Sequence, residues 1–339
     1  MAVLKGAVAM ALTDEGVIRV DGFASRWVRL PGGVKAHYMT AGDEGPAVVL
    51  LHGGLMGSSG AAGWQHLAPE LGRKGFRVYC PDLPSFGLTE DRTGYYEPGI
   101  QGHVDFVHDF TSALCLDRFH LAGNSAGCLA TVQYVVAHPD RVLRFALIAG
   151  RVGDLVSMEE YIAVREETGF QPVQLAGIFD GTAESMEKLL RAITHRQGSI
   201  SSDLLEMRTL AANTHQEAYG KHMEASFAAA RGGDQDTNNA VRLSTKGRLD
   251  RITIPAIYLY GQDDVMQPVE DGYLQEKALP NIQFFYPANC GHQGQSDQPE
   301  IFTQVFAEFF GTGEVTRSTA DRAGVSKNRP ELHSVVQQV

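Results

Sequence analysis

A strand, a glycine-rich turn and a helix follow one another near the middle of the chain, and this order constrains the fold more than any other feature. FHLAG (residues 119–123) has the apolar run of a buried strand, and GCLATVQYVVAH (127–138) has the pattern of a helix. The segment 102–115 before them predicts another helix, and LRFALIAG (143–150) after them another buried strand. Strands that alternate with helices imply parallel βαβ units. We therefore predict an α/β fold with a mostly parallel central sheet flanked by helices.

The pattern of elements divides the chain into a core, an inserted cap and a tail. Strand-like runs alternate with turn signals over residues 17–80, whereas residues 151–245 lose the strands and contain helical segments. Strands and a closing amphipathic helix resume after that stretch. We expect residues 1–150 and 246–312 to form the α/β core, 151–245 a helical cap, and 313–339 a polar tail that is flexible or lies on the surface.

Charge and composition exclude several classes of function. The net charge of −11 repels phosphate backbones and anionic membranes, so neither nucleic acid nor a membrane is an expected partner. The four cysteines show no CxxC spacing, which indicates free thiols. Nothing in the sequence indicates a metal or an organic cofactor. The oligomeric state stays open, a homo-oligomer included.

The beginning of the chain only weakly resembles a signal peptide. MAVLKGAVAMAL carries Lys5 near its start, and its apolar part is short before Asp14 and Glu15. No apolar run approaches the ~20 residues that a membrane-spanning helix needs. We therefore predict a cytoplasmic protein.

The turn between strand 119–123 and helix 127–138 indicates a nucleophilic serine. It reads Gly123-Asn124-Ser125-Ala126-Gly127, a G-x-S-x-G sequence in the strand, turn and helix context of a nucleophile elbow. The sharp turn holds the serine oxygen clear of the sheet and crowds its neighbours, so glycine is needed two positions to either side. A glycine-rich turn without catalytic meaning is the alternative.

A serine hydroxyl needs a base, and that base needs an orienting acid. His292 lies in Asn-Cys-Gly-His after the last apolar strand, on a loop at the edge where such sheets carry their active sites. The strand AIYLY (256–260) ends before Gly261-Gln262-Asp263-Asp264, at the same edge. We prefer Asp264 as the acid, with Asp263 in reserve and Asp154 as an outside candidate. The order Ser125, Asp264, His292 is that of the α/β-hydrolases.

Backbone donors for an oxyanion are expected beside the nucleophile. Leu-Leu-His-Gly-Gly (50–54) ends another apolar strand, so the N–H of Gly54 is placed to meet the N–H of Ala126 around a developing negative charge. A plain glycine turn is the alternative at this position.

Residues 35–310 resemble the α/β-hydrolases that cleave carbon–carbon bonds in meta-cleavage products of aromatic degradation. LLHGG, the Gly-Asn-Ser elbow, GQDDVMQP and NCGH carry the resemblance. It implies a water-assisted split of a vinylogous 1,5-diketone acid into a dienoate and a carboxylic acid. It also implies a small hydrophobic substrate whose carboxylate is held by an arginine of the cap.

Arg208 matches that cap arginine, and the sequence gives an independent reason to notice it. On a helical wheel it falls inside the apolar arc of LLEMRTLA, where a guanidinium needs an anionic partner. A structural arginine is the alternative. The resemblance also places Asn124, Gln293 and His66 at the substrate pocket. Gln293 stands where the family usually has tryptophan, and His66 replaces a pocket asparagine.

Three functions remain in competition. Carbon–carbon hydrolysis leads, and a carboxylesterase or lactonase is the second candidate, because the same fold and triad serve those reactions. A ligand-sensing protein on a hydrolase fold is a minor third, since all three triad positions carry competent residues.

Overall fold

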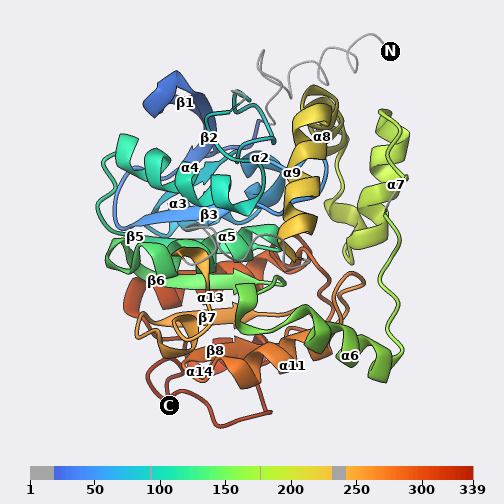
Figure 1. Cartoon of the computed structure of the whole chain (residues 1–339). Coiled ribbons are helices and arrows are strands. Elements are labelled where there is room, and N and C mark those ends of the chain that lie inside the picture. The colour runs from blue at the N-terminus through green and yellow to red at the C-terminus, as the bar shows by residue number, and fades with distance from the viewer. Residues whose placement is uncertain (1–18, 92–93, 176, 231–241, 339) are drawn as a thin grey trace, which may run out of the picture.

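The computed structural model describes residues 19–91, 94–175, 177–230 and 242–338. At its centre is an eight-stranded sheet of order β1-β2-β4-β3-β5-β6-β7-β8 (Figure 1). β2 is antiparallel to β1 and β4, and the strands from β4 to β8 in that order pair in parallel. The strands are β1 (Ala24–Arg29), β2 (Lys35–Ala41), β3 (Ala47–Leu51), β4 (Arg77–Pro81), β5 (Phe119–Asn124), β6 (Val142–Ile148), β7 (Ala256–Leu259) and β8 (Ile282–Phe285). The predicted mostly parallel sheet is confirmed.

The sheet is covered on both faces, because its strands are apolar at successive positions. In β3, Val48 and Leu50 point into one core, whereas Val49 and Leu51 point into the other. The first core is completed by α2 (Gly60–Trp64), α3 (Ala68–Arg73) and α13 (Pro299–Thr312). The second is completed by α4 (Ile100–Ala113), α5 (Ala126–Ala137) and α11 (Val269–Ala278).

Between β6 and β7, where the cap was predicted, the described residues contain four longer helices. They are α6 (Met158–Thr168), α7 (Ala183–Ile193), α8 (Ser202–Thr214) and α9 (Gln216–Ala230). Figure 1 shows α7, α8 and α9 together on one side of the sheet, and α6 below them near α11. An ion pair of 2.6 Å between Arg165 and Asp271 fastens α6 to α11. The limits predicted for the cap stay a prediction.

The C-terminal segment packs more closely than its polar sequence indicates. It contains α14 (Arg317–Arg322), and its Val315 and Val336 are fully buried. The carboxylate of Glu308 accepts hydrogen bonds from the backbone N–H of Thr316, at 2.8 Å, and from the hydroxyl of Thr319. The segment thus lies against the rest of the structure, one of the two arrangements expected for it, and a few apolar side chains spaced among polar ones anchor it.

No helix among the described residues is long and apolar enough to cross a membrane. The opening segment, on which the expectation about a signal peptide rests, lies outside the described residues.

Candidate active site

Ser125 occupies a strained turn between β5 and α5. Its φ of 56° and ψ of −118° are a backbone conformation that a residue with a side chain rarely adopts. The flanking glycines allow the turn, since a Cβ on Gly123 would lie 2.1 Å from the carbonyl oxygen of Gly127. A Cβ on Gly127 would lie 2.4 Å from the carbonyl oxygen of Leu51. The elbow therefore has the local geometry that its sequence predicted.

His292 lies between Ser125 and Asp264. Its Nε2 is 2.8 Å from the Oγ of Ser125, and its Nδ1 is 2.7 Å from Oδ2 of Asp264. Both His292 and Asp264 are almost completely buried. The arrangement brings together a hydroxyl, an imidazole and a carboxylate in the order that base-assisted nucleophilic attack requires.

The other oxygen of Asp264 is held by the loop that carries it. Oδ1 accepts hydrogen bonds from the backbone N–H groups of Met266, at 2.8 Å, and Gln267, at 3.1 Å. Asp154, the outside candidate, instead accepts hydrogen bonds from Ser244 and Thr245. Asp264 is thus fixed with one oxygen free to face the imidazole.

The segment after β3 lies against the elbow. A Cβ on Gly54 would lie 2.9 Å from the Cβ of Ala126, and no described hydrogen bond uses the backbone N–H of either residue. Ala126 also begins α5, where the helix dipole favours negative charge. The two residues whose N–H groups are predicted to bind an oxyanion are therefore in contact.

His52 fixes the peptide that carries the Gly54 N–H. The backbone N–H of Leu83 donates to its Nε2 at 3.0 Å, so the ring proton resides on Nδ1, which donates to the carbonyl of Gly53 at 2.8 Å. Burial lowers the pKa of His52, which favours this neutral form. In the sequence, His52 stands out only as part of the LLHGG motif, and its place before a Gly-Gly turn is the available signal for this role.

Asn124 and Gln293 flank the arrangement of Ser125, His292 and Asp264. The side-chain amide of Asn124 donates to the carbonyl of His292 at 3.0 Å and to that of Ile148 at 3.2 Å, so it ties the histidine loop to the elbow. Gln293 directly follows His292 and precedes the short helix α12 (Gly294–Asp297).

A second tie to the histidine loop comes from Asp297, which the sequence analysis missed. This buried carboxylate accepts hydrogen bonds from the backbone N–H groups of Gly291, at 2.9 Å, and Arg196, at 2.8 Å. It thereby links the loop of His292 to the cap. Burial raises its pKa. A lone acidic residue beside a helix start carries no signal of such a role.

Arg208 is buried in α8, with 2% of its surface exposed. Its Nη2 donates to the carbonyl of Met56 at 3.1 Å and to the hydroxyl of Ser58 at 3.2 Å, while its Nε is buried without a partner. Burial lowers its pKa to about 10, so it stays cationic at neutral pH. It forms no ion pair with any carboxylate of the described chain. Met56 and Ser58, which bind this guanidinium, lie in the same loop (residues 53–58) as Gly54, the predicted oxyanion donor.

His66 lies near Arg196, Glu300 and Ser199 rather than beside the three residues around His292. Burial and the charge of Arg196 lower its pKa, and Glu300 and the backbone of Ser199 are also near it. No contact in the described part of the chain joins its side chain to Ser125 or His292, so its role at the substrate pocket stays a prediction.

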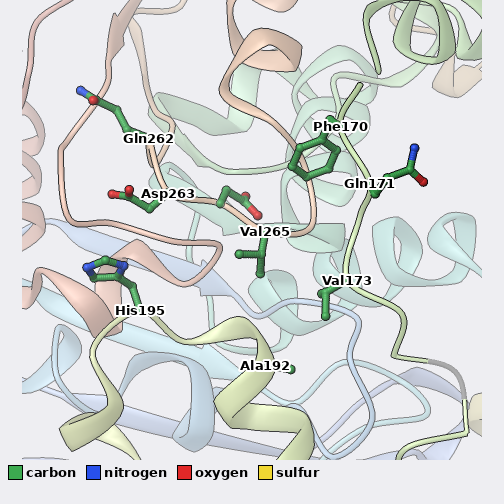
Figure 2. A pocket seen from close by; sticks show the side chains of 9 residues that line it. Phe170, Gln171, Val173, Ala192, His195, Gln262, Asp263 and Val265 are labelled. Atoms are coloured by element: carbon green, nitrogen blue, oxygen red, sulfur yellow. The ribbon is translucent and has the colours of Figure 1, made fainter. Parts of the chain in front are cut away.

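An open cleft of about 610 Å³ lies between the cap and the loop that carries Asp264 (Figure 2). Neither Ser125 nor His292 lines it, so of these three residues only Asp264 borders the cleft. Its lining residues are Phe170, Gln171, Val173, Ala192, His195, Gln262, Asp263, Asp264 and Val265.

A comparison with known families agrees with this geometry. Residues 46–299, most of the chain, match a family model described as the alpha/beta hydrolase fold. The chain belongs to the α/β-hydrolase fold family. Among the curated relatives of this α/β-hydrolase is a 2-hydroxy-6-oxononadienedioate/2-hydroxy-6-oxononatrienedioate hydrolase from Paraburkholderia phymatum. The two are 28% identical over 314 residues, which cover 88% of this chain and 100% of the relative.

A second curated relative and a solved structure are also similar to this chain. A 2-hydroxy-6-oxo-2,4-heptadienoate hydrolase from Pseudomonas putida is 29% identical over 282 residues, covering 83% of this α/β-hydrolase and 94% of the relative. A solved membrane phospholipase A shares the fold with a TM-score of 0.69 at 22% identity, over 91% of each chain. With this family and these relatives, the chain is an enzyme of the hydrolase class.

Proposed function

We propose that this enzyme hydrolyses a carbon–carbon bond in a ring-fission product of aromatic degradation. Ser125 is its nucleophile, His292 the base and Asp264 the residue that orients the base. Gly54 and Ala126 supply the oxyanion hole, and Arg208 holds a carboxylate of the substrate. Names of curated relatives at 28% and 29% identity support this reaction class. The cytoplasmic location expected from the sequence belongs to the same proposal.

The geometry supports a two-stage reaction. Nε2 of His292 takes the proton of Ser125 as its oxygen bonds to the ketone carbon of the substrate, and the oxyanion forms beside the two backbone N–H groups. The bond to the dienol fragment then breaks, and its electron pair leaves on that fragment, which takes the proton from His292. Water, deprotonated by the same imidazole, next cleaves the ester on Ser125 and releases a carboxylic acid.

The single observation that carries the proposal is the unpaired charge of Arg208. Its guanidinium is buried among neutral groups, with Nε lacking a partner and two neutral oxygens as its acceptors. A buried cation without an anion is costly, and a substrate carboxylate removes that cost. Arginine also binds carboxylates through a planar fork of donors. An ester without an acid group gives Arg208 no such role.

An ester or lactone hydrolase is the second candidate. Gln293 stands after His292 where the resembling family has tryptophan, and Nη2 of Arg208 already has two oxygen partners. The minor third reading, a ligand sensor, is disfavoured by the short Ser125–His292 and His292–Asp264 distances, which a binding site does not need.

One comparison tests the proposal. A purified preparation is assayed with a 2-hydroxy-6-oxo-dienoate and with a short aryl ester, each over a range of concentrations. The proposal expects kcat/KM for the dienoate to exceed that for the ester. Turnover of the ester alone establishes the second candidate, and tight binding of either compound without turnover establishes the sensor.

A further inference from the structure

Arg151 stands at the same sheet edge as Ser125. β5 and β6 are parallel neighbours, with Asn124 opposite Ile148, and the N–H of Ser125 donates to the carbonyl of Ile148 at 2.9 Å. A Cβ on Gly150 would lie 2.4 Å from the carbonyl oxygen of Ser125. Arg151 therefore directly follows Gly150, the residue whose backbone packs against the elbow.

The backbone that carries Arg151 is held firmly. The hydroxyl of Tyr258 accepts a hydrogen bond from the N–H of Gly150 at 2.8 Å and donates to the carbonyl of the same residue. Ala149 before it has a φ of 47°, a strained conformation for alanine. The surrounding contacts hold this strained backbone in place, so they also fix the position from which the Arg151 side chain extends. Enforced strain of this kind is typical of a site built for binding.

The guanidinium of Arg151 rests on apolar partners and has no counter-ion. It lies over the ring of Tyr161, 5.2 Å from its centre, and its Nη1 is 2.7 Å from the sulfur of Met158. The nearby carboxylate of Asp271 is paired with Arg165 at 2.6 Å. Within the described chain, Arg151 forms no ion pair. Arg151, Arg165 and Asp271 together hold two guanidiniums and one carboxylate, which leaves an excess of one positive charge.

We propose that Arg151 is a second anion site, which binds a carboxylate on the acyl side of the scissile bond. This inference rests on the proposed function and deepens it. Arg208 belongs to the cap and holds the acid of the dienoate fragment, whereas Arg151 follows the core strand beside the nucleophile. The substrate is then a dicarboxylate, and the acyl group transferred to Ser125 leaves as a short dicarboxylic acid.

The test uses two substrates that differ only at the distal end. They are 2-hydroxy-6-oxonona-2,4-dienedioate and its analogue with a carboxamide at carbon 9. Each is assayed with the parent enzyme, with Arg151→Met and with Arg151→Lys. Arg144→Met is the matched control, since Arg144 lies in β6, the strand that precedes Arg151, and donates to the carbonyl of Phe310, away from the elbow. Thermal unfolding of each variant verifies the fold.

The parent enzyme should prefer the diacid. Arg151→Met should lower kcat/KM for the diacid at least about tenfold, mainly through KM, because a charge-assisted contact is lost. The amide should change less than about threefold, Arg151→Lys should retain part of the preference, and Arg144→Met should change neither substrate. Equal turnover of both substrates by the parent, or equal losses in Arg151→Met, overturns the inference while leaving the proposed function intact. Failure of the parent enzyme to cleave either dienoate overturns both.

Discussion

Asp263 and Asp264 are neighbours in the chain, yet their carboxylates bind different partners. Oδ2 of Asp264 is 2.7 Å from Nδ1 of His292, whereas Oδ2 of Asp263 accepts a hydrogen bond from the backbone N–H of Cys290 at 3.2 Å. The first contact orients the imidazole ring. The second only steadies the loop on which that imidazole is carried.

Exchange of each carboxylate for an amide separates these two roles. Asp264→Asn should lower kcat by several orders of magnitude, because the amide favours the wrong tautomer of His292. Asp263→Asn should cost less than about tenfold, since Cys290 keeps an oxygen acceptor. Steady-state kinetics on one substrate decide the matter, and a crippled Asp263→Asn with an active Asp264→Asn reverses the assignment.

Replacement of Ser125 by alanine should remove essentially all hydrolysis and leave the fold intact. Its Oγ contacts His292 rather than packing in the core, so the melting temperature should change little. Loss of a nucleophile typically costs several orders of magnitude in turnover. Activity within about tenfold of the parent would show that another group attacks the substrate.

His52 should affect turnover without touching the substrate. His52→Phe removes the hydrogen bond to the Gly53 carbonyl, so the Gly54 N–H loses its fixed direction and kcat should fall about tenfold or more with KM little changed. His103→Phe is the control, since both rings pack against Phe86. Similar losses of kcat in both variants would reduce His52 to a packing role.

Acid should destabilise the enzyme through buried histidines. The rings of His103 and His222 stack with centres 4.5 Å apart, and burial lowers the pKa of His222 from 6.5 to about 4 and that of His103 as well. Below pH 6.5 the unfolded chain binds protons that the folded chain rejects, so the free energy of unfolding falls as the pH falls toward 4.

A variant isolates this contribution. His222→Phe should flatten the fall in unfolding free energy between pH 6.5 and 4, a change on the order of 2 kcal/mol. The exposed His333→Phe should leave it unchanged. Chemical denaturation at several pH values measures both, and an unaltered slope in His222→Phe would remove His222 from the explanation.

Short-range patterns predicted the sheet and the placement of the central residues. Ser125 is recognisable because its turn requires glycine at both flanks, and His292 and Asp264 because each follows an apolar strand whose carboxyl end meets the same edge. The helical wheel also predicted that Arg208 is buried. In each case the constraint is local or follows from parallel strands.

Other features depend on contacts between distant segments. The hydrogen bond from Leu83 that sets the tautomer of His52 joins two separate loops, and no local pattern predicts it. The packing of Val315 and Val336 was missed because isolated apolar residues in a polar tail give no periodic signal. Helices α2 and α3 are short and rich in glycine, proline and alanine, so propensity alone does not show them.

The charge of Arg208 offers the most direct test of the central claim. Arg208→Met keeps the length of the side chain and removes its charge, while Arg208→Lys keeps the charge and loses the fork. The quantity to measure is kcat/KM of the parent and each variant for a carboxylate-bearing dienoate and for a neutral aryl ester. We expect Arg208→Met to impair the dienoate by roughly 2–5 kcal/mol and the ester far less, with Arg208→Lys in between. Equal losses on the charged and the neutral substrate would contradict the account, because an arginine that only braces the cap lowers both activities together.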